Sequence, residues 1–254
     1  MRAAIITIAG ISSRFNEGIP EEEKTLKAIY TNREIKDTLL FHLVKKCSYA
    51  DLIVLVGGYR YQQLIEFISD ELRESFPQIV SIENKYYTTL SSGYSLYLGI
   101  REAIKNNADE ILFAEGDLDV DDESFSRIIA SDRSVLTYNY EPIYTNKAVI
   151  LYKGTGNLYQ YTFSNSHGMV TISEPFSCIF NSGQIWKFTE TDILKKANDQ
   201  FYLEEKEGTN LAIIQRYINL ISEDMIQLIG LRRWTNCNTR EDYQNIMEYW
   251  RKEQ

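Results

Sequence analysis

The residues best suited to bind a ligand lie in the first loop of the chain, which follows a short apolar run from Ala3 to Ile8. Ala9-Gly10-Ile11-Ser12-Ser13 supplies small side chains and one glycine, so a ligand can approach the backbone closely. Arg14 follows directly, and Lys24 comes ten residues later. Backbone N–H groups, a guanidinium and an ammonium together can hold a polyphosphate. This stretch predicts polyphosphate binding; the alternative is an ordinary turn with two surface cations.

A second group of polar residues offers oxygen ligands for a metal ion. The acidic stretch Glu115 to Asp122 follows an apolar run, and within it Asp117 comes directly after a glycine. A carboxylate at the end of a buried strand suits Mg²⁺, which takes one or two protein oxygens and fills its shell with phosphates and water. Asn238 can offer an amide oxygen to the same ion if its strand joins the same sheet. The alternatives are a solvated acidic turn at a helix start and, for Asn238, a turn residue.

Alternating strands and helices must position these groups in the first half of the chain. Apolar runs predict buried strands at 3–8, 51–56, 79–82 and 110–114, and helical spacing predicts helices at 38–46, 62–76, 91–105 and 124–130. Such alternation favours βαβ units and a mostly parallel sheet, whose strand ends meet along one edge. The first loop, Gly58 and Asp117 are therefore expected at one crevice.

The second half lacks the regular alternation of strands and helices. We expect short strands at 135–140, 148–153, 158–163, 169–172 and 177–180, helices at 185–197 and 211–221, and a strand at 226–231. A closing helix at 239–252 has Thr239 as its N-cap and Asp242 at the capping-box position. The prediction is one α/β domain over 1–254 with a mixed, mostly parallel sheet flanked by helices. We expect residues 1–130 to form a nucleotide-binding half, and 131–254 to form a half that binds the second substrate, the acceptor, and carries the C-terminal metal ligand.

Composition excludes several classes of function. The 254 residues carry a net charge of −9, which argues against binding nucleic acid or an anionic membrane surface. The three cysteines lack the spacing of a zinc site and are expected to be free thiols in a reducing compartment. No apolar run approaches the roughly 18 residues of a membrane helix, and no secretory cleavage pattern follows the N-terminus. We therefore expect a cytoplasmic protein with no membrane partner.

Several blocks of this sequence resemble the sugar-nucleotide pyrophosphorylase and cytidylyltransferase superfamily. The run Ile8 to Phe15, with Lys24 and Leu26 after it, resembles the signature A-A-G-x-G-[ST]-R-[FM] followed by P-K-x-L. Four further blocks match in order and spacing: VGGY at 56–59, NKY at 84–86 with SGYSL at 92–96, EGD at 115–117, and NCNTREDY at 236–243. The NKY–SGYSL pair and the EGD block look like the phosphocholine cytidylyltransferase group. Two residues depart from the pattern: Ser12 replaces a glycine, and Asn238 replaces the second metal aspartate.

The resemblance implies a Rossmann-like, GT-A-like nucleotide-diphospho-sugar transferase fold and a nucleotidyltransferase reaction. An ionised acceptor oxygen would attack the α-phosphorus of a nucleoside triphosphate, expected to be CTP, and pyrophosphate would leave. Arg14 would hold the β- and γ-phosphates and Lys24 the α-phosphate, and Mg²⁺ would bind Asp117 and Asn238. The nucleotide would contact the first loop and two further segments through Ala9, Gly10, Ile11, Ser12, Ser13, Gly58, Ser92 and Gly93.

The acceptor implied is a small phospho- or phosphono-compound such as phosphocholine, an aminoalkylphosphonate or a sugar phosphate. A cationic acceptor needs aromatic or acidic neighbours, for which Tyr86, Tyr138 and Glu204 are candidates. Two other functions remain open. One is a glycosyltransferase that uses a nucleotide-sugar, because Asp117-Leu118-Asp119 spells its DxD motif. The other is a catalytically silent nucleotide-binding protein, which the two departures favour.

Overall fold

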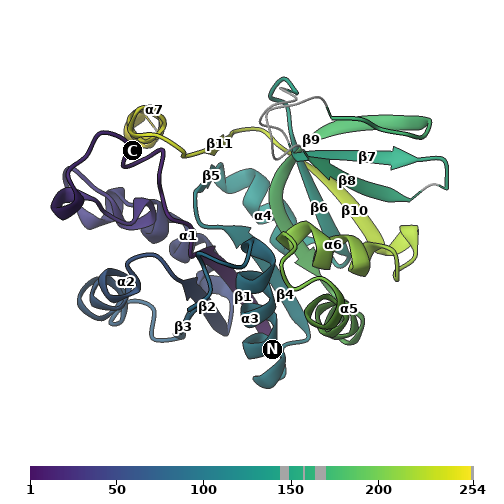
Figure 1. The fold of residues 1–254 in the computed structure, drawn as a ribbon, viewed down its shortest axis with the longest axis horizontal. Helices are drawn as coiled ribbons and strands as arrows, with labels where there is room; N and C mark the ends of the chain where they lie inside the picture. The colour runs from purple at the N-terminus through teal and green to yellow at the C-terminus, as the bar shows by residue number, and fades with distance from the viewer. Residues whose placement is uncertain (144–148, 157, 164–169, 253–254) are drawn as a thin grey trace.

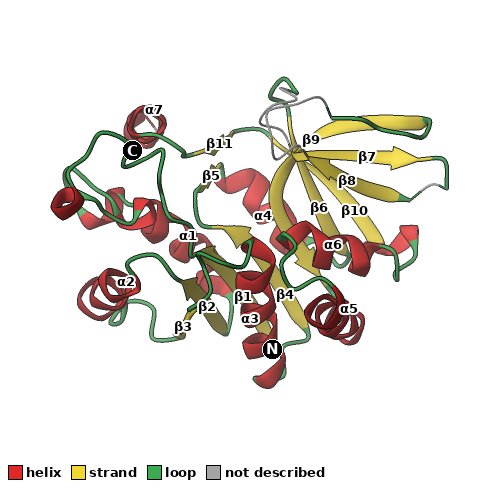
Figure 2. Ribbon diagram, viewed as in Figure 1, coloured by secondary structure: helices red, strands yellow, loops and turns green. Residues whose placement is uncertain are grey.

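A nine-stranded mixed sheet forms the centre of the protein, with helices packed on both faces (Figures 1 and 2). The computed structural model describes residues 1–143, 149–156, 158–163 and 170–252. None of the helices in these ranges combines the length and the apolar character needed to cross a membrane. The sheet and the helices on its two faces confirm the predicted α/β architecture with a mostly parallel sheet.

Seven strands give the sheet its main path. Their spatial order is β10 (Ile226–Leu231), β6 (Ser134–Asn139), β9 (Phe176–Phe188), β4 (Glu110–Glu115), β1 (Arg2–Ile8), β2 (Leu52–Gly57) and β3 (Ile79–Glu83). β1 lies between β2 and β4 and is parallel to both, whereas β9 is antiparallel to β4 and β6. Beside this path, β7 (Val149–Gly154) pairs with β9, and β8 (Tyr159–Phe163) pairs with β7. The carboxyl ends of β1, β2, β3 and β4 consequently lie at one edge.

Alternation along β1 supplies both halves of the core. Ala4, Ile6 and Ile8 face one apolar cluster, and Ala3 and Ile5 face the other. The first cluster includes residues of α1 (Leu39–Lys46), α2 (Tyr61–Phe67), the π-helical turn Ile68–Leu72 that continues α2, and α4 (Asp122–Ala130). The second includes residues of α3 (Ser92–Lys105), α5 (Thr191–Glu204) and α6 (Asn210–Ile218).

A two-stranded antiparallel sheet and the last helix lie outside the main sheet. β5 (Leu118–Val120) pairs with β11 (Trp234–Asn236), and α7 (Arg240–Lys252) follows. The expected capping box is present, because Thr239 N donates to Asp242 Oδ2 at 2.7 Å and Asp242 N donates to Thr239 Oγ1 at 3.1 Å. The strand before Asn238 was expected to join the main sheet. It is β11, which pairs with β5 in the smaller sheet instead.

Two predicted elements in the second half are wrong. Residues 185–188 belong to the thirteen-residue strand β9, and the following helix begins at Thr191 instead of Ile185. A short apolar run does not distinguish a strand from a helix, and here it fills the gap between β4 and β6. Of the predicted strand at 169–172, Met169 lies outside the described residues and 170–172 form no strand.

Candidate functional site

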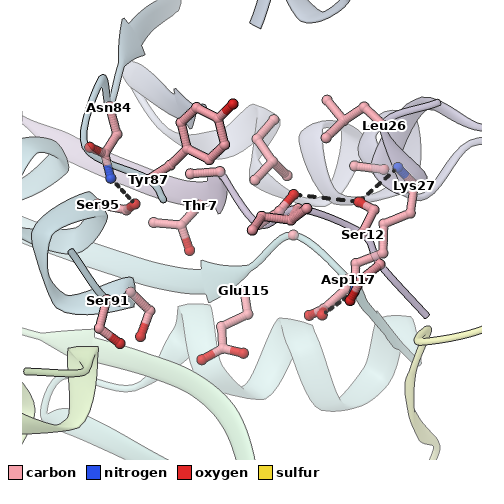
Figure 3. A pocket seen from close by; sticks show the side chains of 18 of the residues that line it. Thr7, Ser12, Leu26, Lys27, Asn84, Tyr87, Ser91, Ser95, Glu115 and Asp117 are labelled. Atoms are coloured by element: carbon pink, nitrogen blue, oxygen red, sulfur yellow. Dashed lines mark hydrogen bonds and ion pairs between the residues drawn. The ribbon is translucent and has the colours of Figure 1, made fainter. Parts of the chain in front are cut away.

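A pocket of about 480 Å³ opens at the carboxyl ends of the parallel strands (Figure 3). Its lining comes from the first loop, a buried segment after Thr25, the β3–α3 connection with the first turn of α3, and the end of β4. The lining residues are Thr7, Ile8, Ala9, Gly10, Ile11, Ser12, Ser13, Leu26, Lys27, Ala28, Asn84, Tyr87, Leu90, Ser91, Ser92, Ser95, Glu115, Gly116 and Asp117. The first loop, Ser92 and Asp117, all predicted from the sequence as site residues, thus surround one space.

Ser12 has the backbone conformation of a glycine. Its φ angle is 58°, in the left-handed region that glycine adopts without steric cost. Its hydroxyl lies 3.5 Å from Gly10 O and 3.5 Å from Lys27 N, so the side chain spans the loop and the segment opposite. The loop therefore keeps the path that a glycine favours, at a cost of about 1 kcal/mol for a non-glycine residue in this region.

Glu115 is the pocket's ionisable group with the most perturbed acidity. It ends β4, and its Oε1 accepts a hydrogen bond from Asn210 Nδ2 at 2.7 Å. Burial, and next the negative charge of Asp117, raise the pKa of Glu115 to about 7, while Asn210 and Lys27 act in the opposite direction. Asn210 N also donates to Ser92 Oγ at 3.2 Å, which fixes the start of α6 against the start of α3.

We expect replacement of Glu115 by glutamine to change how stability depends on pH. The folded-state pKa is raised from 4.5 to about 7, so the folded protein binds the extra proton in this range and its free energy of unfolding falls as pH rises. Glu115→Gln should remove this fall and be more stable than the wild type by on the order of 2 kcal/mol at pH 8, with no advantage near pH 4.5. Urea unfolding across this range, in the presence of a chelator, measures the effect.

The matched control is Glu83→Gln, which removes the charge of a carboxylate at the end of β3 whose side chain is 41% exposed. Parallel stability–pH curves for the wild type and Glu115→Gln would contradict the assignment of the shifted group.

Two lysines three residues apart in the sequence have different surroundings. Lys24 Nζ lies 2.7 Å from Glu21 Oε2, and Lys24 is not among the residues that line the pocket. Lys27 does line it, and its Nζ lies 2.7 Å from Asp117 Oδ2 and 3.0 Å from Cys237 O. The lysine that spacing selects is therefore turned to Glu21, and the lysine beside Asp117 was not predicted.

Arg14, predicted to bind phosphate, and Asn238, predicted to bind the metal, contact each other. Arg14 Nη2 donates to Asn238 Oδ1 at 2.7 Å. Arg14 is exposed beside the first loop, and Cys237 N, next to Asn238, donates to Asp117 O at 2.7 Å. The C-terminal segment is thus tied to both the first loop and the end of β4, although Asn238 does not line the pocket.

A divalent cation fits Asp117 better than it fits Asn238. Asp117 Oδ1 is buried and has no hydrogen-bond partner in the described part of the chain, so one carboxylate oxygen is free to bind a cation. Asn238 Oδ1 is bound to Arg14 and would have to leave it to become a ligand. Within the described ranges no group of three or more histidine, cysteine, aspartate or glutamate residues could hold a metal. Mg²⁺ fits such a sparse site because phosphates and water can complete its shell.

Asp119, the last residue of the DxD sequence, is engaged elsewhere. It is 2% exposed, accepts a hydrogen bond from Trp250 Nε1 at 3.0 Å and forms an ion pair with Arg233. These contacts fix α7 to β5 and leave Asp119 no access to the pocket. The motif therefore contributes Asp117 alone.

The remaining predicted residues lie outside the pocket lining. A side chain at Gly58 would meet Tyr87 at 2.7 Å, and one at Gly93 would meet Gly208 O at 2.5 Å, so both glycines allow close packing around the site. The three acceptor candidates are not brought together: Tyr86 is 55% exposed against Tyr94, Tyr138 packs on Phe180, and Glu204 pairs with Arg216.

Other pocket residues were not predicted to bind the ligand. Asn84 is fully buried, and its Nδ2 donates to Ser95 Oγ at 2.9 Å while its Oδ1 accepts from Tyr86 N at 2.9 Å. It therefore fixes the β3–α3 connection beside the pocket. Asn84 and Ser95 belong to the NKY and SGYSL blocks, so the sequence singles out both segments, although it assigns these two residues no role.

The fold, with its pocket at the strand ends, is similar to the folds of solved nucleotidyltransferases. The CTP:phosphocholine cytidylyltransferase LicC from Streptococcus pneumoniae is similar to this chain, with a TM-score of 0.65, 18% identity and coverage of 98% of this chain and 99% of that one. The inositol-1-phosphate CTP transferase from T. maritima has a TM-score of 0.67, 15% identity and coverage of 98% and 95%. A structure described as a putative glucose-1-phosphate thymidylyltransferase from Bacillus anthracis has a TM-score of 0.68 and 13% identity, and the match covers 98% of this chain and 95% of that one.

Within this fold, the chain belongs to the family described as "Domain of unknown function (DUF6564)", which matches residues 23–250. No curated protein is similar enough in sequence to be matched to it.

Proposed function

We propose that this protein is a nucleotidyltransferase that joins a nucleoside triphosphate, expected to be CTP, to a small phospho- or phosphono-acceptor and releases pyrophosphate. The observation that carries the proposal is the pocket itself, in which a small-residue loop, an ammonium and a carboxylate with a free oxygen surround one space. Two of the similar structures are named as transferring CTP, which supports cytidine as the base. The phosphocholine transferase among them supports a small phosphorylated acceptor.

The chain's own groups suit an in-line displacement. Backbone N–H groups of residues 9–13 and the Arg14 guanidinium would bind the leaving phosphates, and Ser92 would face the base. An acceptor phosphate is already ionised near neutral pH, so the reaction needs alignment and charge neutralisation instead of a general base. Asp117, and Asn238 once released from Arg14, would hold Mg²⁺, which when bound supplies neutralising charge at the α-phosphate.

The glycosyltransferase alternative is disfavoured by the DxD residue that does not face the pocket. Asp119 is buried against Trp250 and Arg233, so a metal held by two aspartates of this motif has no second ligand. One observation favours the silent nucleotide-binding alternative. Asp117 and Asn238, the two metal-ligand candidates, each already contact a cationic side chain of the protein itself.

A pyrophosphate-release screen separates these functions. Four nucleoside triphosphates are each incubated with Mg²⁺ and a panel of phosphocholine, aminoalkylphosphonates and sugar phosphates. We expect acceptor-dependent pyrophosphate release, highest with CTP. Measurable triphosphate binding with no pyrophosphate from any pair would leave the silent binding protein as the function.

A further inference from the structure

Lys27 is held in place by the buried residues on either side of it. Leu26 is 2% exposed and Ala28 is 1% exposed, and both belong to the apolar cluster beneath the pocket. Lys27 begins the 3-10 helix Lys27–Ile29, and its side chain lies against Asp117 (Figure 3). Because both neighbours are anchored in the core, the Lys27 side chain is directed into the pocket and not to solvent.

The two partners of the Lys27 ammonium come from distant parts of the chain. Asp117 Oδ2, after β4, is 2.7 Å away, and Cys237 O, after β11, is 3.0 Å away. The side chains of Lys27 and Asp117 are only 17% and 19% exposed, so solvent screens their attraction less than it screens a surface pair. One ammonium therefore connects the N-terminal segment, the metal-binding candidate and the C-terminal segment.

Asp117 has one oxygen bound and one oxygen free. Oδ2 accepts from Lys27, whereas Oδ1 is buried without a partner among the described residues. An unpaired buried carboxylate oxygen is costly, and a divalent cation would satisfy it. Such a cation would stand within a few ångströms of the ammonium, and the two positive charges would repel each other strongly in this partly buried site.

We propose that Lys27 is a built-in counter-ion of Asp117, which competes with a divalent metal ion for this carboxylate and moves to the triphosphate when the metal binds. The second half of this statement rests on the nucleotidyltransferase function proposed above. The first half concerns only the competition between Lys27 and a metal ion for Asp117, and it does not depend on which substrate the pocket binds. Lys24 cannot fill this role in the structure, because its ammonium is bound to Glu21 and lies outside the pocket lining.

Metal binding in the absence of nucleotide tests the proposal. Mn²⁺ is titrated into the protein and the free ion is followed by electron paramagnetic resonance. Lys27→Met should raise the Mn²⁺ affinity by at least about tenfold over the wild type, since it removes the competing charge. Lys27→Arg keeps the charge and should stay near the wild-type affinity. Lys27→Gln, a neutral side chain that still donates hydrogen bonds, should show the same gain and covers the case in which the methionine variant does not fold.

Two further variants locate the effect. Lys105→Met removes a lysine from the far end of α3, where its side chain is 74% exposed and paired with Glu102, and should leave Mn²⁺ binding unchanged. Asp117→Asn, added to Lys27→Met, should abolish the gain. Equal Mn²⁺ affinity in the wild type and both neutral Lys27 variants would overturn the proposal, as would a gain that survives Asp117→Asn. Because no nucleotide is present, these outcomes are independent of whether pyrophosphate release is ever observed.

Discussion

Lys27→Met should lower the rate of pyrophosphate release by about a hundredfold or more, the usual cost of losing a positioned charge at a reacting phosphate. In the structure Lys27 is the lysine of the pocket, and its ammonium has a carboxylate partner that a metal ion would take over. Lys24→Met should lower the rate by less than about threefold, because an exposed ion pair with Glu21 contributes little.

Steady-state rates of the two variants, measured with the best substrate pair, decide between the two lysines. Lys105→Met controls for the loss of a lysine charge far from the pocket. A large loss in Lys24→Met with little change in Lys27→Met would contradict the structural assignment. It would instead support the role for Lys24 that the sequence resemblance implies.

Gly116→Ala should destabilise the protein by about 3 kcal/mol and displace Asp117. A Cβ atom at this position would lie 2.1 Å from Ile8 Cγ2 and 2.9 Å from Thr7 O, and neither atom belongs to a long flexible side chain. Gly116 N also donates to Thr7 O at 3.0 Å, so the residue cannot move away from β1 without losing that bond. Overpacking of this kind costs about 1–3 kcal/mol, and more where backbone is involved.

Gly10→Ala is the matched control for stability. A Cβ atom there has no neighbour within 4 Å, so the free energy of unfolding should change by less than about 0.5 kcal/mol. Urea unfolding of both variants measures the difference. If Gly116→Ala unfolds at the same urea concentration as the wild type, the close approach of β4 to β1 that positions Asp117 is wrong.

The first half of the fold was predictable because each element there has a distinct local pattern. β1 and β2 are apolar runs with several β-branched residues, and α3 is an amphipathic helix between turn residues, so their order alone places the first loop and Asp117 at one edge. The second half was less predictable. β9 enters between β4 and β6, and it carries Lys187, a buried lysine that donates to Ile129 O and Ser131 O. A local pattern contains no sign of such long-range partners.

The site was predictable as a set of segments but not at the level of single side chains. Lys24 and Lys27 lie three residues apart in a segment without regular periodicity, and spacing from Arg14 selects Lys24. Which of them faces the pocket depends on the burial of Leu26 and Ala28, a tertiary property. In the same way, Asn238 reaches Arg14 because β11 pairs with β5, which no sequence window reveals.

The proposed reaction joins a nucleotide to an acceptor through a new phosphorus–oxygen bond. ³¹P nuclear magnetic resonance of wild-type protein with Mg²⁺, CTP and the best acceptor tests it directly. We predict that the three CTP resonances disappear while one equivalent of pyrophosphate and a coupled pair of new phosphorus resonances, from the nucleotide joined to the acceptor, appear together. Release of inorganic phosphate or CDP without the coupled pair, or unchanged CTP despite measurable binding, would contradict it.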